Sequence, residues 1–189
     1  MRQVLDMQQK RLDEGKPIVN ISVNFSRKHQ ENQAYLDRLD ELMAQYKVPA
    51  KSLEIEITES VFMQDLAPLI DSICQLKKRG FSVSIDDFGA GYSSLNVLSK
   101  VKADIVKLDR QFLLDVEMEK DNITSEFLQL LINMIKKLGF SVLAEGVETA
   151  EQVALLKNAG CRFAQGFYYA RPMPIEQFLE FLDKHEIEE

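Results

Sequence analysis

Apolar residues recur along the chain with two different periods. Leu66, Leu69, Ile73 and Leu76 lie three or four positions apart, which places them on one face of a helix. Short stretches rich in Val, Ile and Phe, such as 81–86, are typical of strands. The pattern predicts six strands, near 18–25, 53–58, 81–86, 105–108, 141–145 and 162–165. It also predicts helices near 4–14, 27–46, 66–79, 93–98, 125–138, 150–159 and 174–185, with an acidic surface loop at 114–122.

One arrangement of residues is repeated. Segments 77–86 and 136–145 each end a predicted helix with basic residues, pass through a glycine and continue as a short strand into an acid. Lys and Arg suit the negative end of a helix dipole, and Gly80 and Gly139 can adopt the left-handed conformation that ends a helix. A fainter copy occupies 157–165. This repetition predicts an α/β fold with parallel strands.

The chain is short for a closed parallel barrel, which takes about eight strands and about 250 residues. It has 189 residues and begins inside a predicted helix, with no strand before it. Either the sheet is open and doubly wound, or a barrel lacks its first part. The start inside a helix favours the second interpretation. We expect one domain over 1–189, because no low-complexity linker interrupts it.

Composition narrows the classes of partner. The formal net charge of −7 argues against binding to a nucleic-acid polymer, which needs a basic surface. A small anionic ligand remains compatible, because bound cations reverse the local field. No apolar run is long enough to span a membrane, and the polar start does not resemble a secretory signal. We therefore expect a cytoplasmic location without membrane contact, and two reduced cysteines, Cys74 and Cys161.

Polar residues gather where the predicted strands end, which is where parallel barrels build their active sites. They are Asn24, Glu56, Glu59, Asp86, Asp87, Lys107, Glu145, Glu148 and Gln165. Any one acid taken alone would be explained as the N-cap of the next helix. The adjacent pair Asp86-Asp87 places two like charges at the edge of a core, which costs energy unless cations or protons neutralise them. Lys107 lies within an apolar strand, where the alternative to a catalytic role is a simple ion pair.

Carboxylates and an amide oxygen form a hard site that prefers Mg²⁺, Mn²⁺ or Ca²⁺. His29 and His185 lie on predicted helix surfaces, so zinc coordination by His and Cys is not expected. Two cations held by these carboxylates would suit the cleavage of a phosphoester. The segment 87–95 contains two glycines before a helix cap and is predicted to be a mobile loop.

A set of short motifs follows one another in a fixed order along the chain. They are Val23-Asn24-Phe25-Ser26, Glu56-Ile57-Thr58-Glu59, Asp86-Asp87-Phe88-Gly89, Lys107-Leu108-Asp109, Glu145-Gly146-Val147-Glu148 and Gln165-Gly166-Phe167. Together they resemble the EAL domain family over essentially the whole chain. The resemblance implies a modified TIM barrel that hydrolyses cyclic di-GMP to linear pGpG, using Mg²⁺ or Mn²⁺.

The resemblance also implies roles for the residues. Asn24, Glu56, Asp86 and Asp87 are expected to be metal ligands. Lys107 resembles the lysine that holds the catalytic water, and Glu145 resembles a general base or a ligand of the metal and water. Glu148 and Gln165 are expected to support the site, and Glu59 to anchor the loop after Asp87. The family's dimer is expected to communicate through that loop.

The chain departs from the family pattern in lacking the Glu-Ala-Leu strand. We therefore expect an incomplete barrel with about six of the eight strands, without the first metal-ligand glutamate and an arginine that contacts substrate phosphate. This predicts impaired hydrolysis and self-association through an open sheet edge. The alternatives are a non-catalytic module that binds cyclic di-GMP or a protein, and a fragment with no function of its own. The chain is also compatible with being the cytosolic part of a larger signalling protein.

Overall fold

Six parallel strands form one sheet in the computed structural model, which describes residues 1–25, 33–58, 66–90, 98–119 and 122–185. The strands pair in chain order, each with the next. They are β1 (Ile21–Asn24), β2 (Leu53–Thr58), β3 (Ser82–Phe88), β4 (Ile105–Leu108), β5 (Ser141–Ala144) and β6 (Phe163–Ala164). All six lie where the sequence predicted a strand, although β1 and β6 are shorter than expected.

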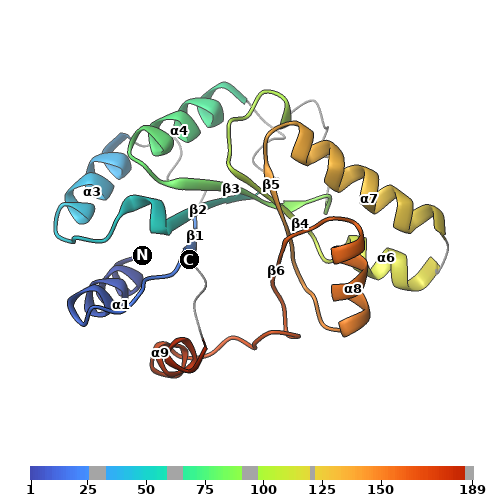
Figure 1. The fold of residues 1–189 in the computed structure, drawn as a ribbon. Coiled ribbons are helices and arrows are strands. Elements are labelled where there is room, and N and C mark those ends of the chain that lie inside the picture. The colour runs from blue at the N-terminus through green and yellow to red at the C-terminus, as the bar shows by residue number, and fades with distance from the viewer. Residues whose placement is uncertain (26–32, 59–65, 91–97, 120–121, 186–189) are drawn as a thin grey trace.

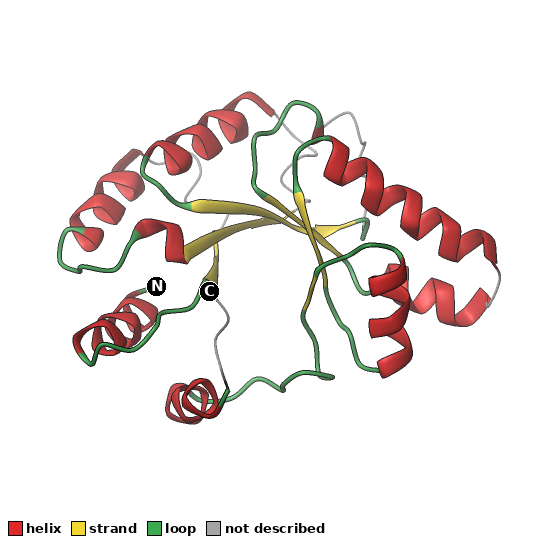
Figure 2. Ribbon diagram, in the orientation of Figure 1, coloured by secondary structure: helices red, strands yellow, loops and turns green. Residues whose placement is uncertain are grey.

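Most of the helices lie on the outer side of the curved sheet and follow its course (Figures 1 and 2). They are α1 (Arg2–Asp13), α3 (Gln33–Met43), α4 (Leu66–Lys78), α6 (Gln111–Glu119), α7 (Asn122–Lys137), α8 (Ala150–Asn158) and α9 (Ile175–Lys184), with a 3₁₀ turn at Ala50–Ser52. None of the described helices is long and apolar enough to span a membrane.

The sheet is an incomplete TIM-type barrel. It curves through its six strands, and β1 and β6 have no strand partner on their outer sides among the described residues. Two helices from opposite ends of the chain lie together at the opening, because Asp183 on α9 forms ion pairs with Arg11 at 2.8 Å and with Lys16 at 2.7 Å. The prediction of an α/β barrel with six strands is confirmed.

The two faces of the sheet differ in polarity because side chains alternate along each strand. Ile55, Val83 and Val106 are fully buried beneath the outer helices. The inner face carries polar residues, beginning with Ser22, which donates a hydrogen bond of 3.1 Å to Glu54. Apolar packing thus holds the helices on the outer face of the sheet, and the polar residues of the inner face are available for a site at the strand ends.

The predicted surface loop at 114–122 was wrong, because most of it is helical. α6 covers Gln111–Glu119 and α7 begins at Asn122. Asp109 caps the start of α6, where its Oδ1 accepts a 2.8 Å hydrogen bond from the Gln111 backbone. Leu113 is buried against the core, so tertiary packing stabilises a segment whose acidic sequence indicates exposure.

The helix predicted at 93–98 lies mostly outside the described residues, as does the start of the one predicted at 27–46. The described part of the latter ends at Met43. α7 buries Leu128, Leu131 and Ile135, whereas Leu138, directly after the helix, is 44% exposed. Both cysteines are free, as expected.

Candidate active site

Lys107 lies at the centre of the strand ends, on the inner face of β4. Its side chain is almost wholly buried, and its ammonium group donates hydrogen bonds to Glu56 and, at 2.9 Å, to Glu145. Asp86 Oδ1 lies 3.7 Å from the same nitrogen. One buried cation is therefore shared by three carboxylates from β2, β3 and the end of β5, which is more than the simple ion pair considered from the sequence.

The charge on Lys107 is maintained by these neighbours. Burial by itself lowers the pKa of a lysine, but the hydrogen bonds to Glu56 and Glu145 outweigh burial and raise the Lys107 pKa above its ordinary value. The lysine is thus a permanent cation at neutral pH. It neutralises only part of the negative charge around it.

Asp86, Asp87 and Glu145 form a carboxylate cluster. Each offers one oxygen atom, and these atoms all lie within 4.8 Å of one another. Burial is the main cause that raises the pKa of both Asp86 and Glu145, whereas the charge of Lys107 opposes it. Buried Asp86 Oδ1 accepts no hydrogen bond from the described residues. The cluster therefore has the donor atoms and the uncompensated charge that a hard divalent cation requires.

A β-bulge turns the two neighbouring aspartates towards the same site. Ile85 pairs with Val106 and Phe88 with Leu108, so β3 takes three residue steps where β4 takes two. Asp87 has a φ of 55°, unlike any other non-glycine residue that the structure describes. In a regular strand, consecutive side chains point to opposite faces. The extra residue lets both carboxylates reach Glu145.

Hydrogen bonds connect the ends of β5 and β6 next to Glu145. Gln165 donates a 2.9 Å hydrogen bond to the Glu145 carboxylate. The backbone N–H of Val147 donates to the Gln165 carbonyl at 3.1 Å. Gly166 makes this approach feasible, because a Cβ there would lie 2.2 Å from the Val147 carbonyl oxygen. Gln165 is therefore fixed beside the carboxylate that it contacts.

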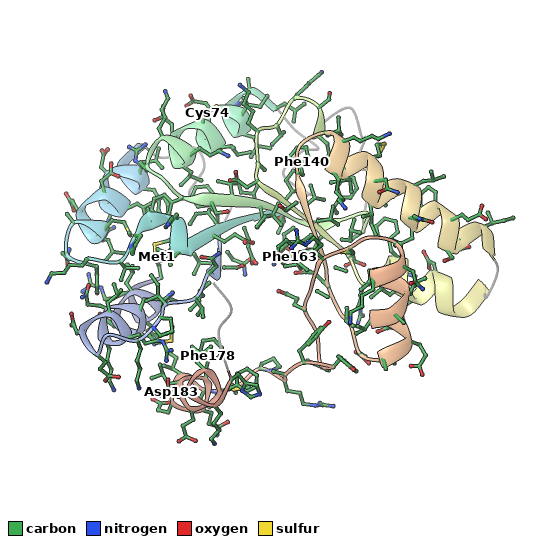
Figure 3. All side chains as sticks on the ribbon, in the orientation of Figure 1. Met1, Cys74, Phe140, Phe163, Phe178 and Asp183 are labelled. Carbon is green, nitrogen blue, oxygen red and sulfur yellow. The ribbon has the colours of Figure 1, made fainter. Side chains whose placement is uncertain are left out.

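A pocket of about 510 Å³ extends from Glu145 to α9. Its wall combines Arg110 and Arg171 with Phe167, and the Arg171 guanidinium lies 4.8 Å from the centre of the Phe167 ring. The far wall includes Phe178, which lies on the side of α9 that faces the inside of the curved sheet (Figure 3). The pocket is thus acidic at the site and basic and aromatic further out.

The structure brings together five of the nine residues predicted for the site, namely Glu56, Asp86, Asp87, Lys107 and Glu145. Gln165 joins them through Glu145. Asn24 lies beside Glu56 in the register of β1 and β2, on the same face. Glu148 lines the pocket, and its backbone N–H donates to Gln152.

Glu59 lies outside the described residues, so its expected anchoring role stays a prediction, and His29 lies there too. His185 is exposed at the end of α9, away from the carboxylate cluster.

Sequence reasoning missed several residues around the site. Arg110 follows Lys107-Leu108-Asp109 closely, so the strand-end rule that selected Lys107 would have found it. Arg171 and Phe178 follow a two-residue strand and carry no such signal. Ser84, two residues before Asp86, is fully buried, and its hydroxyl has no partner among the described residues. A serine inside a predicted strand does not indicate from the sequence that its hydroxyl is buried without a hydrogen-bond partner in the described part of the chain.

Comparisons with known proteins agree on one family. The EAL domain profile matches residues 1–172. The cyclic di-GMP phosphodiesterase NbdA of Pseudomonas aeruginosa is 35% identical over 164 residues, which are 87% of this chain and 21% of that protein. The chain thus spans about a fifth of the length of this relative.

Solved structures give the same result. The EAL domain of Mycobacterium smegmatis DcpA superimposes with a TM-score of 0.86 and 27% identity, over 99% of this chain and 83% of that one. Klebsiella pneumoniae BlrP1, in a manganese and cyclic di-GMP complex, has a TM-score of 0.75 and 26% identity, over 88% of this chain and 42% of that one. With its family profile covering most of the sequence, and with this barrel and this ring of carboxylates around Lys107, the chain belongs to the EAL domain family.

Proposed function

We propose that this chain is a metal-dependent phosphodiesterase domain that hydrolyses cyclic di-GMP to linear pGpG. The observation that carries the proposal is the cluster of Asp86, Asp87 and Glu145 around buried Lys107. The cluster lies at the strand ends, where barrel enzymes carry out their chemistry. The name of NbdA and the cyclic di-GMP complex of BlrP1 support the choice of substrate.

The cofactor that fits the cluster is Mg²⁺ or Mn²⁺. Asp86 and Asp87 would hold it, with Glu56 and Asn24 as further oxygen ligands on the neighbouring strands. The buried Asp86 Oδ1 supports this assignment, because it accepts no hydrogen bond from the described residues and lies 3.7 Å from Lys107, so a bound cation would satisfy it. When bound, such cations stabilise negative charge on phosphoryl oxygens and lower the pKa of a coordinated water.

Lys107 and Glu145 would place the attacking water. The ammonium group of Lys107 already donates to Glu56 and Glu145, and its third proton can hold a water oxygen between them. Glu145 Oε1 is within hydrogen-bond distance of Lys107 and Gln165, which orient the carboxylate to accept a proton from that water.

The pocket beyond Glu145 suits the rest of a cyclic dinucleotide. Arg110 and Arg171 offer guanidinium groups, which bind phosphate oxygens well. The exposed ring of Phe167 offers a face on which a base can stack. Glu148 adds an acceptor at the same wall. These features support a substrate with both phosphate groups and planar bases.

A turnover assay tests the proposal. The purified chain is incubated with cyclic di-GMP and Mn²⁺ or Mg²⁺, and the products are separated by chromatography. We expect pGpG to form only with metal, and Asp86→Asn to lower the rate by at least about 10- to 100-fold. Asp71→Asn, at an exposed position on α4, is the matched control and should retain the rate. Tight binding of cyclic di-GMP without pGpG would instead favour a non-catalytic binding module.

The chain is also proposed to form a homodimer through α7. Ile123, Phe127 and Leu130 are 74%, 55% and 68% exposed and recur at helical spacing on one face. The face occupies the N-terminal half of α7, so two copies could pack this half of the helix against each other. This face supports self-association better than the short sheet edges do.

The reaction is proposed to take place in the cytoplasm. The support is the pair of free thiols, Cys74 and Cys161, since unpaired cysteines are usual in a reducing compartment.

A further inference from the structure

The bulge that carries Asp86 and Asp87 adopts an unfavourable conformation, which its surroundings must hold. Asp87 has a φ of 55°, in the left-handed region, which residues with a side chain adopt much less readily than glycine. The bulge also brings the Asp86 and Asp87 carboxylates close to that of Glu145. Both effects oppose the arrangement when no cation is bound.

The segment that follows β4 contacts the loop after the bulge. Phe112, in the first turn of α6, packs its ring against Gly89, where a Cβ would lie 2.2 Å from the Phe112 Cε2. The Asp109 backbone N–H donates a 3.2 Å hydrogen bond to the carbonyl of Phe88. Two contacts therefore hold the backbone at the end of the bulge. Asp109 binds the Phe88 carbonyl, and the Phe112 ring packs against Gly89.

The backbone of Phe112 is itself fixed in place. Asp109 caps α6 through two contacts, with its Oδ1 accepting from the Gln111 N–H at 2.8 Å and its carbonyl accepting from the Phe112 N–H at 3.3 Å. Asp109 lies two residues after Lys107 on the same chain segment. The backbone that carries the ring is thus tied to the strand that carries the central lysine.

The same segment also contacts the loop that carries Glu145. A Cβ at Gly146 would lie 2.5 Å from the Cβ of Arg110. Residues 110–112 therefore lie against both loops that supply carboxylates to the cluster, Asp86-Asp87 on one side and Glu145 on the other.

We propose that Phe112 is a positioning residue for the metal centre, acting through Gly89 to hold the Asp86-Asp87 bulge in its ligand-presenting conformation. The inference rests on the proposed function, because it requires that the carboxylate cluster binds Mg²⁺ or Mn²⁺. Phe112 neither lines the pocket nor belongs to the carboxylate cluster. It sets the position of the two carboxylates before a cation arrives.

Direct titration with Mn²⁺ tests this, with free Mn²⁺ measured by its electron paramagnetic resonance signal and no substrate present. Phe112→Ala is expected to weaken Mn²⁺ binding about 10-fold, the effect of losing a residue that orients a metal ligand. Phe112→Tyr keeps the ring and should bind within about twofold of the original chain. Leu113→Val is the matched control, because it disturbs the buried neighbour in the same helical turn without touching Gly89.

A double variant identifies the contact. Gly89→Ala should also weaken Mn²⁺ binding, through its φ of 98° and through the clash of the new Cβ with the Phe112 ring. Gly89→Ala combined with Phe112→Ala should bind no more weakly than Gly89→Ala alone, since Phe112→Ala removes that clash and the contact is already disturbed. Additive losses would overturn the inference. So would Mn²⁺ binding by Phe112→Ala within about twofold of the original chain, or an equal loss in Leu113→Val. If the original chain binds no Mn²⁺, the metal centre of the proposed function fails, and this inference fails with it.

Discussion

At the scale of single residues, the site is defined by a shortage of positive charge. Lys107 contacts Glu56 and Glu145 and lies 3.7 Å from Asp86, while Asp87 adds a further carboxylate. One ammonium group cannot neutralise four carboxylates. Removing one of these negative charges should therefore stabilise the metal-free chain, although it would remove a proposed metal ligand.

Asp86→Asn is predicted to raise the melting temperature of the chain in EDTA at neutral pH. Burial first, and then the charges of Glu56 and Asp87, raise the Asp86 pKa against the opposing effect of Lys107. A carboxyl whose pKa is higher in the folded state contributes stability below its pKa in the unfolded state. This contribution is lost as pH rises through its pKa in the folded state. The neutral amide should thus make the chain more stable at neutral pH, and the gain should be smaller in acid.

Thermal unfolding at several pH values, with chelator present, measures this effect. Asp71→Asn, at an exposed position, serves as the control and should leave the melting temperature unchanged. A destabilised Asp86→Asn protein in EDTA would mean that the attraction between Asp86 and Lys107 outweighs the repulsion within the cluster.

At the scale of elements, the loops after the strands are held by local devices that the sequence partly reveals. α8 begins with a capping box, in which the Thr149 hydroxyl accepts from the Gln152 N–H at 3.2 Å and the Gln152 side chain accepts from the Thr149 N–H. Gln152 is buried and also accepts a 2.6 Å hydrogen bond from the Glu148 N–H. The box therefore fixes the loop that carries Glu148 as well as the helix.

Thr149→Ala is predicted to destabilise the chain by about 1 kcal/mol, the usual effect of losing an N-cap hydroxyl. Urea unfolding gives the free energy directly. Thr149→Ser keeps the hydroxyl and should lose much less. Equal stability of the Ala and Ser variants would show that Gln152 alone holds the start of α8.

The element predictions were correct where local signals and packing agree. The repeated basic residues and glycine before β3 and β5 mark real helix ends, and Gly80 and Gly139 have the positive φ that such ends require. α6 was missed because its acidic sequence outweighed its cap at Asp109. The β3 bulge left no signal either, since register depends on the partner strand.

At the scale of the whole molecule, two surfaces lead to predictions: the contact between α9 and α1, and the exposed apolar face of α7. Asp183 on α9 binds Arg11 on α1 and Lys16 just after α1, and it lies more than 160 positions from either residue in the chain. Elsewhere, α7 exposes an apolar face that a monomer normally buries. α7 and α9 lie on different sides of the molecule (Figure 1), so the two features can be tested separately.

Acid is predicted to loosen α9. Hydrogen bonds from Lys16 and then Arg11 lower the Asp183 pKa, so its contribution to stability is present above the unfolded pKa and is lost as pH falls through the folded pKa. Amide hydrogen exchange in 175–184, corrected for the intrinsic effect of pH, should show less protection in acid. Asp183→Asn should show reduced protection already at neutral pH and little further change. Equal protection of both proteins at neutral pH would count against the contact.

Phe127→Glu is predicted to convert a dimer into a monomer. The change puts a charge into the middle of the exposed apolar face, where burial against a second copy would leave it unpaired. Light scattering at high protein concentration gives the molecular mass. Ile175→Glu, at an exposed apolar residue on α9, is the control and should leave the mass unchanged. A chain that is already monomeric before substitution would rule out the dimer.

The sequence alone determined the class of fold, the order of the strands and most of the residues in the cluster. Periodicity reports which residues are buried, and parallel strands place their ends at one edge, so Asp86, Lys107 and Glu145 could be grouped before any coordinates. Only the tertiary structure decided that one lysine serves several carboxylates, that a bulge turns Asp87 towards the others, and that Phe112 lies against Gly89. These depend on register and on distances between segments far apart in the chain, which no local pattern encodes.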